Sequence, residues 1–157
     1  MGETQARPFV VDTSVAIKFY VPEEGHERAV TLLEAARAGA VELLAPGTIL
    51  PEGYNAIVWQ KKRDLLGSEH AGEVWAALLR APIYTYATED LIERAAEISE
   101  EANVVVYDAL FLALAEDART VMVTADDKLL RALERTPYAS LAARLGVKGG
   151  SELPGAR

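Results

Sequence analysis

The chain has 157 residues, of which 50% are hydrophobic and 25% are charged, as in a single soluble globular domain. Its net charge of −8 argues against a protein that coats nucleic acid through a generally basic surface, because neutralised phosphates supply most non-specific affinity. The sequence contains no cysteine, which excludes disulfides, thiolate metal sites and a cysteine nucleophile.

The first predicted elements alternate between strand and helix. Residues 9–12, "FVVD", form a β-rich run that ends in a polar cluster, and "TSVAIKFYV" and "EEGHERAVTLLEAARAG" are then typical of helices. "VELLAP" (residues 41–46) predicts a second short strand. The segment "PEGYNAIVWQKKRDLL" opens with a proline, which a helix tolerates only in its first turn, so we expect Glu52 near the start of that helix.

The alternation continues through the second half of the chain. "SEHAGEVWAALLRA" predicts a helix, residues 82–87 a strand, and "TEDLIERAAEISEEA" and "VVVYDALFLALAEDA" two further helices. "TVMVTAD" (residues 120–126) is the clearest strand, and "DDKLLRALER" follows it as a helix. Beyond Leu133 the pattern fits either a short strand near residues 138–141 or another helical turn. We expect residues 149–157 to be a flexible tail.

Strands that alternate with helices predict an α/β fold with a mostly parallel sheet, whose ligands bind outside the carboxyl ends of the strands. The absence of a long linker or internal repeat predicts one domain over residues 1–157, with its core at about residues 9–147. No uncharged apolar run approaches the length of a membrane span, and residues 1–8 lack the apolar centre of a signal peptide, so we expect a cytoplasmic protein.

Aspartates stand at two of the predicted strand ends. Asp12 ends the first strand, and Asp126 and Asp127 follow "TVMVTA", so all three are expected at the same edge of a parallel sheet. Each has a second interpretation as a helix cap, and Thr124 with Asp127 resembles a capping box. Glu52 and Asn55 share a helix face, on which they either bind a metal or substrate or face water.

Asp108 is the one charged residue in the apolar run "VVVYDALFLALA" (residues 104–115). It either lies at a helix entrance or needs a compensating positive charge, because a helix that is apolar all round belongs in the interior. Several acids without a matching basic motif suggest a metal, and carboxylate oxygens favour hard ions such as Mg²⁺ or Mn²⁺. His26 and His70 lie on polar helical stretches and are expected at the surface, which makes zinc an unsuitable metal.

One short basic patch, Lys61, Lys62 and Arg63, interrupts the acidic composition. It is either a solvated helix end or a local contact for a polyanion. The sequence carries no G-x-S-x-G, Walker or G-x-G-x-x-G motif, which excludes the usual serine hydrolase, P-loop and dinucleotide-binding classes.

Four segments in this order resemble the PIN-domain family and, within it, the VapC-like ribonuclease toxins of type II toxin–antitoxin pairs. They are "VVDTSVAIKFYVPEE", "LAPGTILPEGYNAI" with its E-x-x-N, "YDALFLALAE" and "VTADDKLL", within residues 9–134. The resemblance implies a three-layer α/β/α domain that cleaves RNA with one or two Mg²⁺ or Mn²⁺ ions. The residues that it implies around the ions are Asp12, Glu52, Asp108 and Asp126, with Asp127 as an additional ligand candidate.

The resemblance also implies supporting residues and partners. Ser14 and Thr124 match hydroxyl positions that orient the acids or the metal-bound waters, and Asn55 matches a structural polar position near the site. The implied partners are an RNA substrate, a VapB-like antitoxin and a second copy of the chain. Pro51 and Gly53 depart from the family, which usually carries good helix formers on either side of the residue matched by Glu52.

Two other functional classes remain compatible with the acids. A non-catalytic PIN-like interaction domain would use them as a docking pocket for a basic partner segment, and metal-dependent cleavage would separate it from a nuclease. A metal-dependent phosphatase or receiver-like domain would also use aspartates at strand ends. The first strand lacks the D-x-D of a phosphoaspartate hydrolase, and such a domain has no reason to bury Asp108.

Overall fold

The computed structural model describes residues 5–146, so the expected flexible tail at residues 149–157 lies outside the described residues. Within this range five strands alternate with seven α-helices and two short 3-10 helices. In chain order they are β1 (Arg7–Val11), α1 (Thr13–Lys18), α2 (His26–Arg37), β2 (Val41–Pro46), α3 (Ile49–Lys62), α4 (Ser68–Leu79), β3 (Ile83–Tyr86), η1 (Thr88–Asp90), α5 (Ile92–Ala102), α6 (Val106–Asp117), β4 (Met122–Thr124), α7 (Asp127–Leu133), η2 (Ala139–Leu141) and β5 (Ala142–Arg144).

The five strands form one parallel sheet in the order β3-β2-β1-β4-β5, which confirms the predicted α/β class. β1 occupies the centre, where Val10 is in register with Leu44 of β2 on one side and with Met122 of β4 on the other. Phe9, Val10 and Val11 are all buried, as expected of a central parallel strand that is covered on both faces. All the strands therefore end at one edge of the sheet.

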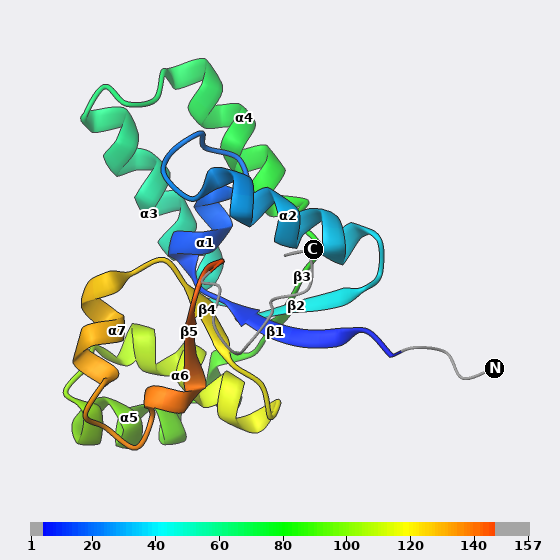
Figure 1. Cartoon of the computed structure of the whole chain (residues 1–157). Coiled ribbons are helices and arrows are strands. Elements are labelled where there is room, and N and C mark those ends of the chain that lie inside the picture. Colours follow the sequence, from blue (N-terminus) through cyan, green and yellow to red (C-terminus); the bar gives the residue numbers. More distant parts are fainter. Residues whose placement is uncertain (1–4, 147–157) are drawn as a thin grey trace.

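Helices cover the sheet on two sides (Figure 1). α6 packs on β1, β2 and β4 and is itself covered by α5, while α1 and α2 contact the sheet at β4 and β2. α3 and α4 form a helical pair that contacts α1 and projects from the layered body. Within residues 5–146 no helix is long and apolar enough to cross a membrane.

α3 begins at Ile49, two residues before the proline that the sequence pattern placed at its start. Pro51 is still in the first turn, where its missing N–H would have no partner within the helix. Gly53 is buried against α4, and a Cβ added to it would lie 2.4 Å from Cδ2 of Leu78. The glycine beside Glu52 therefore allows α3 and α4 to pack closely.

The segment after α7 contains both of the elements that the sequence left open. The 3-10 helix η2 covers residues 139–141, and β5 follows directly at residues 142–144, slightly later than the predicted strand. Thr124 of β4 is in register with Arg144 of β5, and the Leu145 N–H donates to the Thr124 carbonyl at 2.8 Å. β5 thus extends the sheet beside the end of β4.

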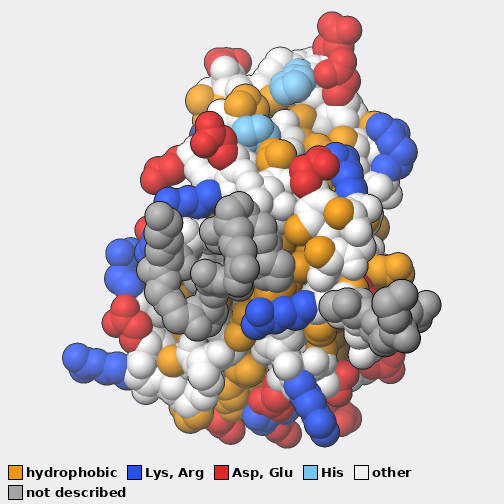
Figure 2. All heavy atoms as spheres, turned by 45° about the vertical axis from the view of Figure 1, so that its right-hand side comes forward, with side chains coloured by type: hydrophobic (Ala, Val, Ile, Leu, Met, Phe, Trp, Pro, Cys, Tyr) orange, Lys and Arg blue, Asp and Glu red, His pale blue; other side chains and the backbone are white. Residues whose placement is uncertain are grey.

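The surface carries several large apolar side chains among charges of both signs. On the face drawn in Figure 2, acidic, basic and apolar side chains are intermixed, so neither sign of charge gathers into one area of that face. The large hydrophobic residues exposed among the described residues are Tyr54, Trp59, Leu65, Leu79, Tyr84, Tyr86, Ile92, Val105 and Tyr107.

Candidate acidic active site

The carboxyl ends of β1 and β4 lie at the point where the strand order reverses. From the central β1 the chain adds β2 and β3 on one side, and it later adds β4 and β5 on the other. Such a switch point is where open parallel sheets bind their ligands. α1 leaves the end of β1 and α7 follows the end of β4 (Figure 1), which brings Asp12 and Asp126 to this position.

Asp12 is buried and held by three donors. Ser14 Oγ donates to Asp12 Oδ1 at 2.6 Å, the Val15 N–H donates to the same oxygen at 3.2 Å, and the buried Thr124 hydroxyl donates to Oδ2. The Val15 contact makes Asp12 the N-cap of α1, as its cap interpretation predicted. A carboxylate offers about four acceptor positions, so Asp12 keeps one for another partner.

Asp126 is the N-cap of α7, and its Oδ1 accepts from the Leu129 N–H at 3.0 Å. The proposed capping box of Thr124 and Asp127 is therefore wrong, because the cap is one residue before Asp127. Thr124 instead joins the two acids, since its hydroxyl accepts from the Asp126 N–H at 3.0 Å and donates to Asp12. The Ala125 N–H donates to Ser14 Oγ at 2.9 Å and closes this network.

Glu52 and Asp108 each lie in the first turn of a helix that begins near the same edge. Glu52 is partly buried in α3, and its Oε2 is a buried oxygen without a hydrogen-bond partner among the described residues. Asp108 is the third residue of α6 and is only partly buried. Of the two interpretations of Asp108, the helix entrance is confirmed, because Asp108 lies in the first turn of α6 and the fully buried stretch begins just after it, at residues 109–115.

Burial, with a smaller contribution from neighbouring charges, raises the pKa values of Asp12, Glu52 and Asp108. Burial raises the pKa of Glu52 to about 7 against the lowering effect of the nearby Thr48 side chain, and the charges of Asp108 and Asp12 add to the rise. Burial and the charges of Asp126 and Asp12 raise the pKa of Asp108 to about 6. Burial also raises the pKa of Asp12, against the lowering effect of its three donors. Within residues 5–146 no lysine or arginine forms an ion pair with these four acids.

The side chains fit a hard divalent cation in donor chemistry and charge. Within the described range, no three histidine or acidic side chains are placed so that they could hold an ion as they stand. The donors are nevertheless carboxylate oxygens without a basic counterion, one of them a buried and unpartnered oxygen of Glu52. Mg²⁺ and Mn²⁺ prefer such oxygens, and either ion would supply the missing positive charge.

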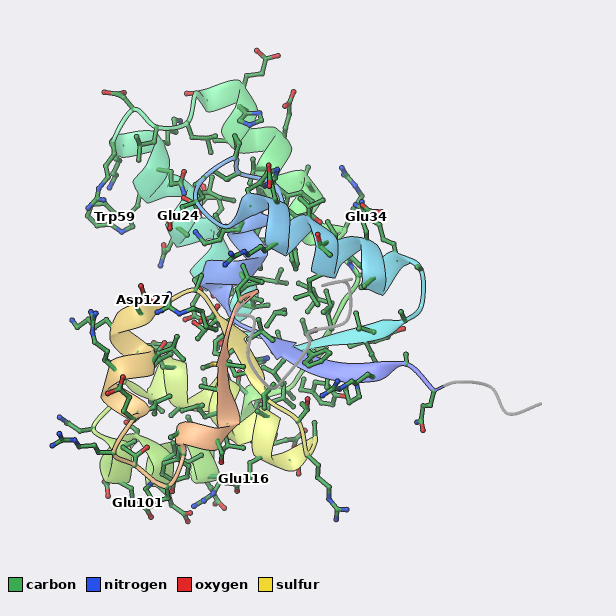
Figure 3. The ribbon with its side chains drawn as sticks, viewed as in Figure 1. Glu24, Glu34, Trp59, Glu101, Glu116 and Asp127 are labelled. Atoms are coloured by element: carbon green, nitrogen blue, oxygen red, sulfur yellow. The ribbon has the colours of Figure 1, made fainter. Side chains whose placement is uncertain are left out.

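The other two predicted site residues, Asn55 and Asp127, are exposed. Asn55 lies on α3. Oδ1 of Asp127 forms an ion pair with Arg144 at 2.5 Å; Figure 3 labels Asp127 at the start of α7. His70 is exposed, as expected, and lies 3.1 Å from Glu73. His26 differs from the expectation, because it is partly buried and its Nδ1 lies 2.6 Å from the Lys18 carbonyl.

A cavity of about 610 Å³ lies beside the Asp126 position and was not predicted from the sequence. It lies between the loop that joins α1 to α2 and the end of β5, and Ala125 and Asp127 line it beside Asp126. Asp12, Glu52 and Asp108 do not line it. Arg144 is part of its wall, and that role could not be predicted because the sequence left the position of β5 open.

Known proteins share both the sequence pattern and the fold. A family model described as the PIN domain matches residues 9–134. Ribonuclease VapC3 of Pyrobaculum aerophilum is 32% identical over 124 residues, which cover 76% of this chain and 90% of that protein.

Three solved structures support the fold. A toxin–antitoxin complex from Klebsiella pneumoniae matches with a TM-score of 0.55 and 19% identity, over 85% of this chain and 94% of that one. PAE2754 from Pyrobaculum aerophilum matches with a TM-score of 0.61 and 18% identity, over 88% and 87%. VapBC2 from Rickettsia felis, bound to a promoter DNA fragment, matches with a TM-score of 0.59 and 12% identity, over 87% and 98%.

Proposed function

Because the chain belongs to the PIN-domain family, we propose that it is a metal-dependent endoribonuclease and the toxin of a VapBC-type toxin–antitoxin pair. The ribonuclease name of the 32% identical relative supports the reaction. The observation that carries the proposal is the convergence of Asp12, Glu52, Asp108 and Asp126 at the switch point without a basic partner. Acids in that arrangement are costly for the fold alone, because burial and the charges of neighbouring aspartates make Asp12, Glu52 and Asp108 harder to ionise.

We assign the metal to the same four acids, which would hold one or two Mg²⁺ or Mn²⁺ ions. A bound ion supplies a water of lowered pKa and positive charge beside the scissile phosphate. Ser14 and Thr124 fix the Asp12 carboxylate by donating to its two oxygens. Asp126 is fixed by the first turn of α7, so these two acids are oriented before any ligand arrives.

Glu52 differs from the aspartates in having a buried oxygen without a hydrogen-bond partner. That oxygen is available to bind an ion or to orient a water molecule. Its pKa of about 7 leaves Glu52 partly protonated at neutral pH when no metal is bound. Ionisation of Glu52 should therefore accompany metal binding, as is general for carboxylate ligands.

We propose that the substrate is single-stranded or looped RNA, whose phosphates can reach a recessed site and whose bases are free for recognition. We further propose that the protein is cytoplasmic and forms one domain over residues 1–157. It would act as a homodimer and be inhibited by a VapB-like antitoxin. The similarity to the toxin–antitoxin complex from Klebsiella pneumoniae and to VapBC2 from Rickettsia felis supports the antitoxin. A basic antitoxin segment would suit the acids, because an arginine among them could form bidentate pairs in place of the metal.

The direct test is RNA cleavage with Mg²⁺ or Mn²⁺ and with excess EDTA. The wild type should cut RNA only with metal. Asp12→Asn, Asp108→Asn and Asp126→Asn should each lose activity while circular dichroism shows an unchanged fold. Glu27→Gln, which removes an exposed acid of α2, is the matched control and should retain full activity. Undiminished cleavage in EDTA would reject the mechanism.

A second candidate is a non-catalytic domain that uses the acids as a docking pocket. Two observations favour it: Asp12 and Asp126 already serve as helix caps, and no three acids among residues 5–146 are placed to hold an ion. Calorimetry separates the candidates. A nuclease should bind Mg²⁺ or Mn²⁺ more weakly after Asp12→Asn, whereas a docking pocket should show no such binding and no cleavage.

The antitoxin is tested by co-expression with the product of the neighbouring gene. The purified complex should cleave RNA more slowly than the free chain and should bind Mg²⁺ more weakly, because the partner and the metal compete for the same acids. A neighbour that neither binds nor inhibits would remove the antitoxin assignment and leave the nuclease assignment standing.

A further inference from the structure

One face of α3 connects the acidic site to the outward end of the helix. Glu52, Asn55, Trp59 and Lys62 are spaced by three or four residues, so they follow one another along a single helix face. Trp59 lies roughly 10 Å along the axis from Glu52, since each residue of an α-helix adds about 1.5 Å. Glu52 is partly buried, whereas the other three side chains are exposed. We call these three exposed residues the α3 stripe.

Trp59 is the most prominent member of the α3 stripe. It is 61% exposed, and Nζ of Lys62 lies 5.4 Å from the centre of its ring. In Figure 3 Trp59 projects outward from α3, clear of the ribbon. Arg63 is exposed four residues after Trp59 and so lies toward the same side of α3, whereas Lys61, also exposed, lies on the other side. The aromatic surface therefore has two cations near it in a chain of net charge −8.

Trp59 contributes little to the packing of its own helical pair. Tyr54 and Trp75 hold α3 and α4 together through an edge-to-face contact, with ring centres 5.2 Å apart. The positions of Tyr54 and Trp59 in the helix repeat place them on different sides of α3. A mainly structural role therefore accounts for Tyr54 and leaves the exposure of Trp59 unexplained.

We propose that the α3 stripe binds single-stranded RNA, with one base stacked on Trp59 and a phosphate held by Lys62, a few nucleotides from the bond at the acids. This inference rests on the proposed ribonuclease function and adds a binding surface to it. Stacking on an exposed aromatic side chain combined with nearby cations is a general mode of single-strand binding. An RNA strand that follows the axis of α3 would run from the recessed acids toward solvent.

The charges at the α3 stripe favour RNA over the other two candidates. A basic antitoxin segment would meet Lys61, Lys62 and Arg63, and like charges oppose that contact. A second copy docked symmetrically through Trp59 would bring two such basic triplets together. RNA meets the same cations with phosphates, so it is the one of the three whose charge is complementary.

The test measures binding separately from cleavage. The double variant Asp108→Asn/Trp75→Phe lacks a candidate metal ligand and keeps Trp59 as its sole tryptophan. In this variant, a single-stranded RNA oligonucleotide should quench the Trp59 fluorescence in a saturable way. In an Asp108→Asn background, fluorescence anisotropy of labelled RNA should show roughly tenfold weaker binding after Trp59→Ala. Trp59→Phe should restore most of the affinity because it keeps an aromatic face.

Matched controls and activity complete the design. Tyr84→Ala removes an aromatic side chain of similar exposure, 62%, from β3 at an outer edge of the sheet, and it should leave RNA affinity unchanged. With Asp108 intact, Trp59→Ala should raise KM for RNA more than it lowers kcat, because the contact is remote from the reacting phosphate.

Three outcomes would overturn the inference. The first is that RNA does not quench Trp59 and Trp59→Ala does not change RNA affinity, although the wild type cleaves RNA. That result would leave the ribonuclease function intact. The second is a change from dimer to monomer on Trp59→Ala with RNA affinity unchanged, which would identify a self-association surface. The third is loss of antitoxin binding in Trp59→Ala with unchanged RNA affinity. Saturable quenching without any metal-dependent cleavage would support RNA binding by the α3 stripe and contradict the nuclease assignment.

Discussion

Asp12 shows that helix capping and a role in the site are compatible in one residue. Its Oδ1 accepts from the Val15 N–H and so caps α1, while its charge acts on Glu52 and Asp108 across the site. Capping fixes the carboxylate at the start of the helix, and Ser14 and Thr124 fix its rotation. The cap that explains Asp12 structurally therefore also orients it for a ligand.

Thr124 is the residue on which the orientation of both aspartates depends. We predict that Thr124→Val lowers the free energy of unfolding by about 1 to 3 kcal/mol, because it leaves an oxygen of buried Asp12 and the Asp126 N–H without their partner. Cleavage activity or metal affinity should fall by about 10- to 100-fold, as for other residues that orient metal ligands. Urea denaturation, calorimetry with Mg²⁺ and cleavage rates measure these effects.

Thr120 provides the control for Thr124 at the opposite end of β4. Its hydroxyl donates to the Pro8 carbonyl at 2.6 Å, away from the acids. Thr120→Val should destabilise the protein by about 1 kcal/mol and leave the cleavage rate and the metal affinity unchanged. Equal losses of activity in the two variants would mean that Thr124 acts only through stability.

Asp108 allows a prediction about pH in the metal-free protein. Its pKa in the folded state is raised from 3.8 to about 6, so the folded state holds the proton more tightly than the unfolded state. Stability from this group is therefore present at low pH and is lost as pH rises from about 4 to 6. Glu52, with a pKa raised from 4.5 to about 7, extends the loss toward neutral pH.

We predict that Asp108→Asn raises the free energy of unfolding at pH 8 without metal by roughly 1 to 2 kcal/mol and changes it little near pH 4. Denaturation in EDTA across this range measures the difference. Excess Mg²⁺ should stabilise the wild type at pH 8 and reduce the advantage of Asp108→Asn. A variant that is less stable than the wild type at pH 8 in EDTA would show that the Asp108 charge stabilises the start of α6.

Among the elements, the alternating strands and helices were predictable, and the positions of their ends were less so. β2 has the predicted bounds, because its apolar run stops at Pro46, whereas the start of α3 was placed two residues late. Ile49 and Leu50 extend that helix without a capping side chain, so the sequence offered no local signal. β5 has only three residues and depends on pairing with β4, which no local pattern reveals.

Residues of the candidate site were predictable from the sequence where a local pattern marks them, and were not predictable where contacts between distant segments place them. Asp12 and Asp126 were predictable because each follows a strand, and parallel strands end at one edge. The hydrogen bond between Thr124 and Asp12 joins residues 112 positions apart, and only the resemblance suggested that Thr124 belongs near the acids. The ion pair of Asp127 with Arg144 depends on β5 and could not be predicted.

Gly53 tests the close packing of α3 against α4. Alanine at a helix-interior glycine usually stabilises by about 0.5 to 1 kcal/mol, but here its Cβ would overlap buried Leu78. Such overpacking costs about 1 to 3 kcal/mol, so we predict that Gly53→Ala lowers the free energy of unfolding by about 1 kcal/mol. Thermal and urea denaturation measure the change.

Gly72 in α4 gives the matched comparison. It is exposed, and nothing lies within 4 Å of a Cβ added there. Gly72→Ala should therefore stabilise the protein by about 0.5 to 1 kcal/mol. If Gly53→Ala stabilised the protein as much as Gly72→Ala, Leu78 would move without cost, and close helix packing would not explain the glycine beside Glu52.

At the scale of the whole molecule, the charge of −8 limits how the protein can hold RNA. Acids and bases are intermixed on the face drawn in Figure 2, so that face does not offer a broad basic track. The triplet Lys61 to Arg63 is the longest run of consecutive cations in the sequence, and it lies at the end of α3. RNA should therefore be held by few phosphate contacts together with base contacts.

We predict a shallow dependence of RNA affinity on salt. Each phosphate neutralised on a single strand contributes a slope of about −0.7 to log K against log salt, so the three cations at the end of α3 give a slope of about −2. Anisotropy titrations of the Asp108→Asn protein with labelled RNA, over a range of KCl, measure it. Lys62→Gln should make the slope shallower by about 0.7, whereas Arg135→Gln, at an exposed position after α7, should not change it.

A slope steeper than about −5 would require many more phosphate contacts than this triplet can make. The RNA would then lie on another surface of the molecule, and α3 would be only a minor part of its path.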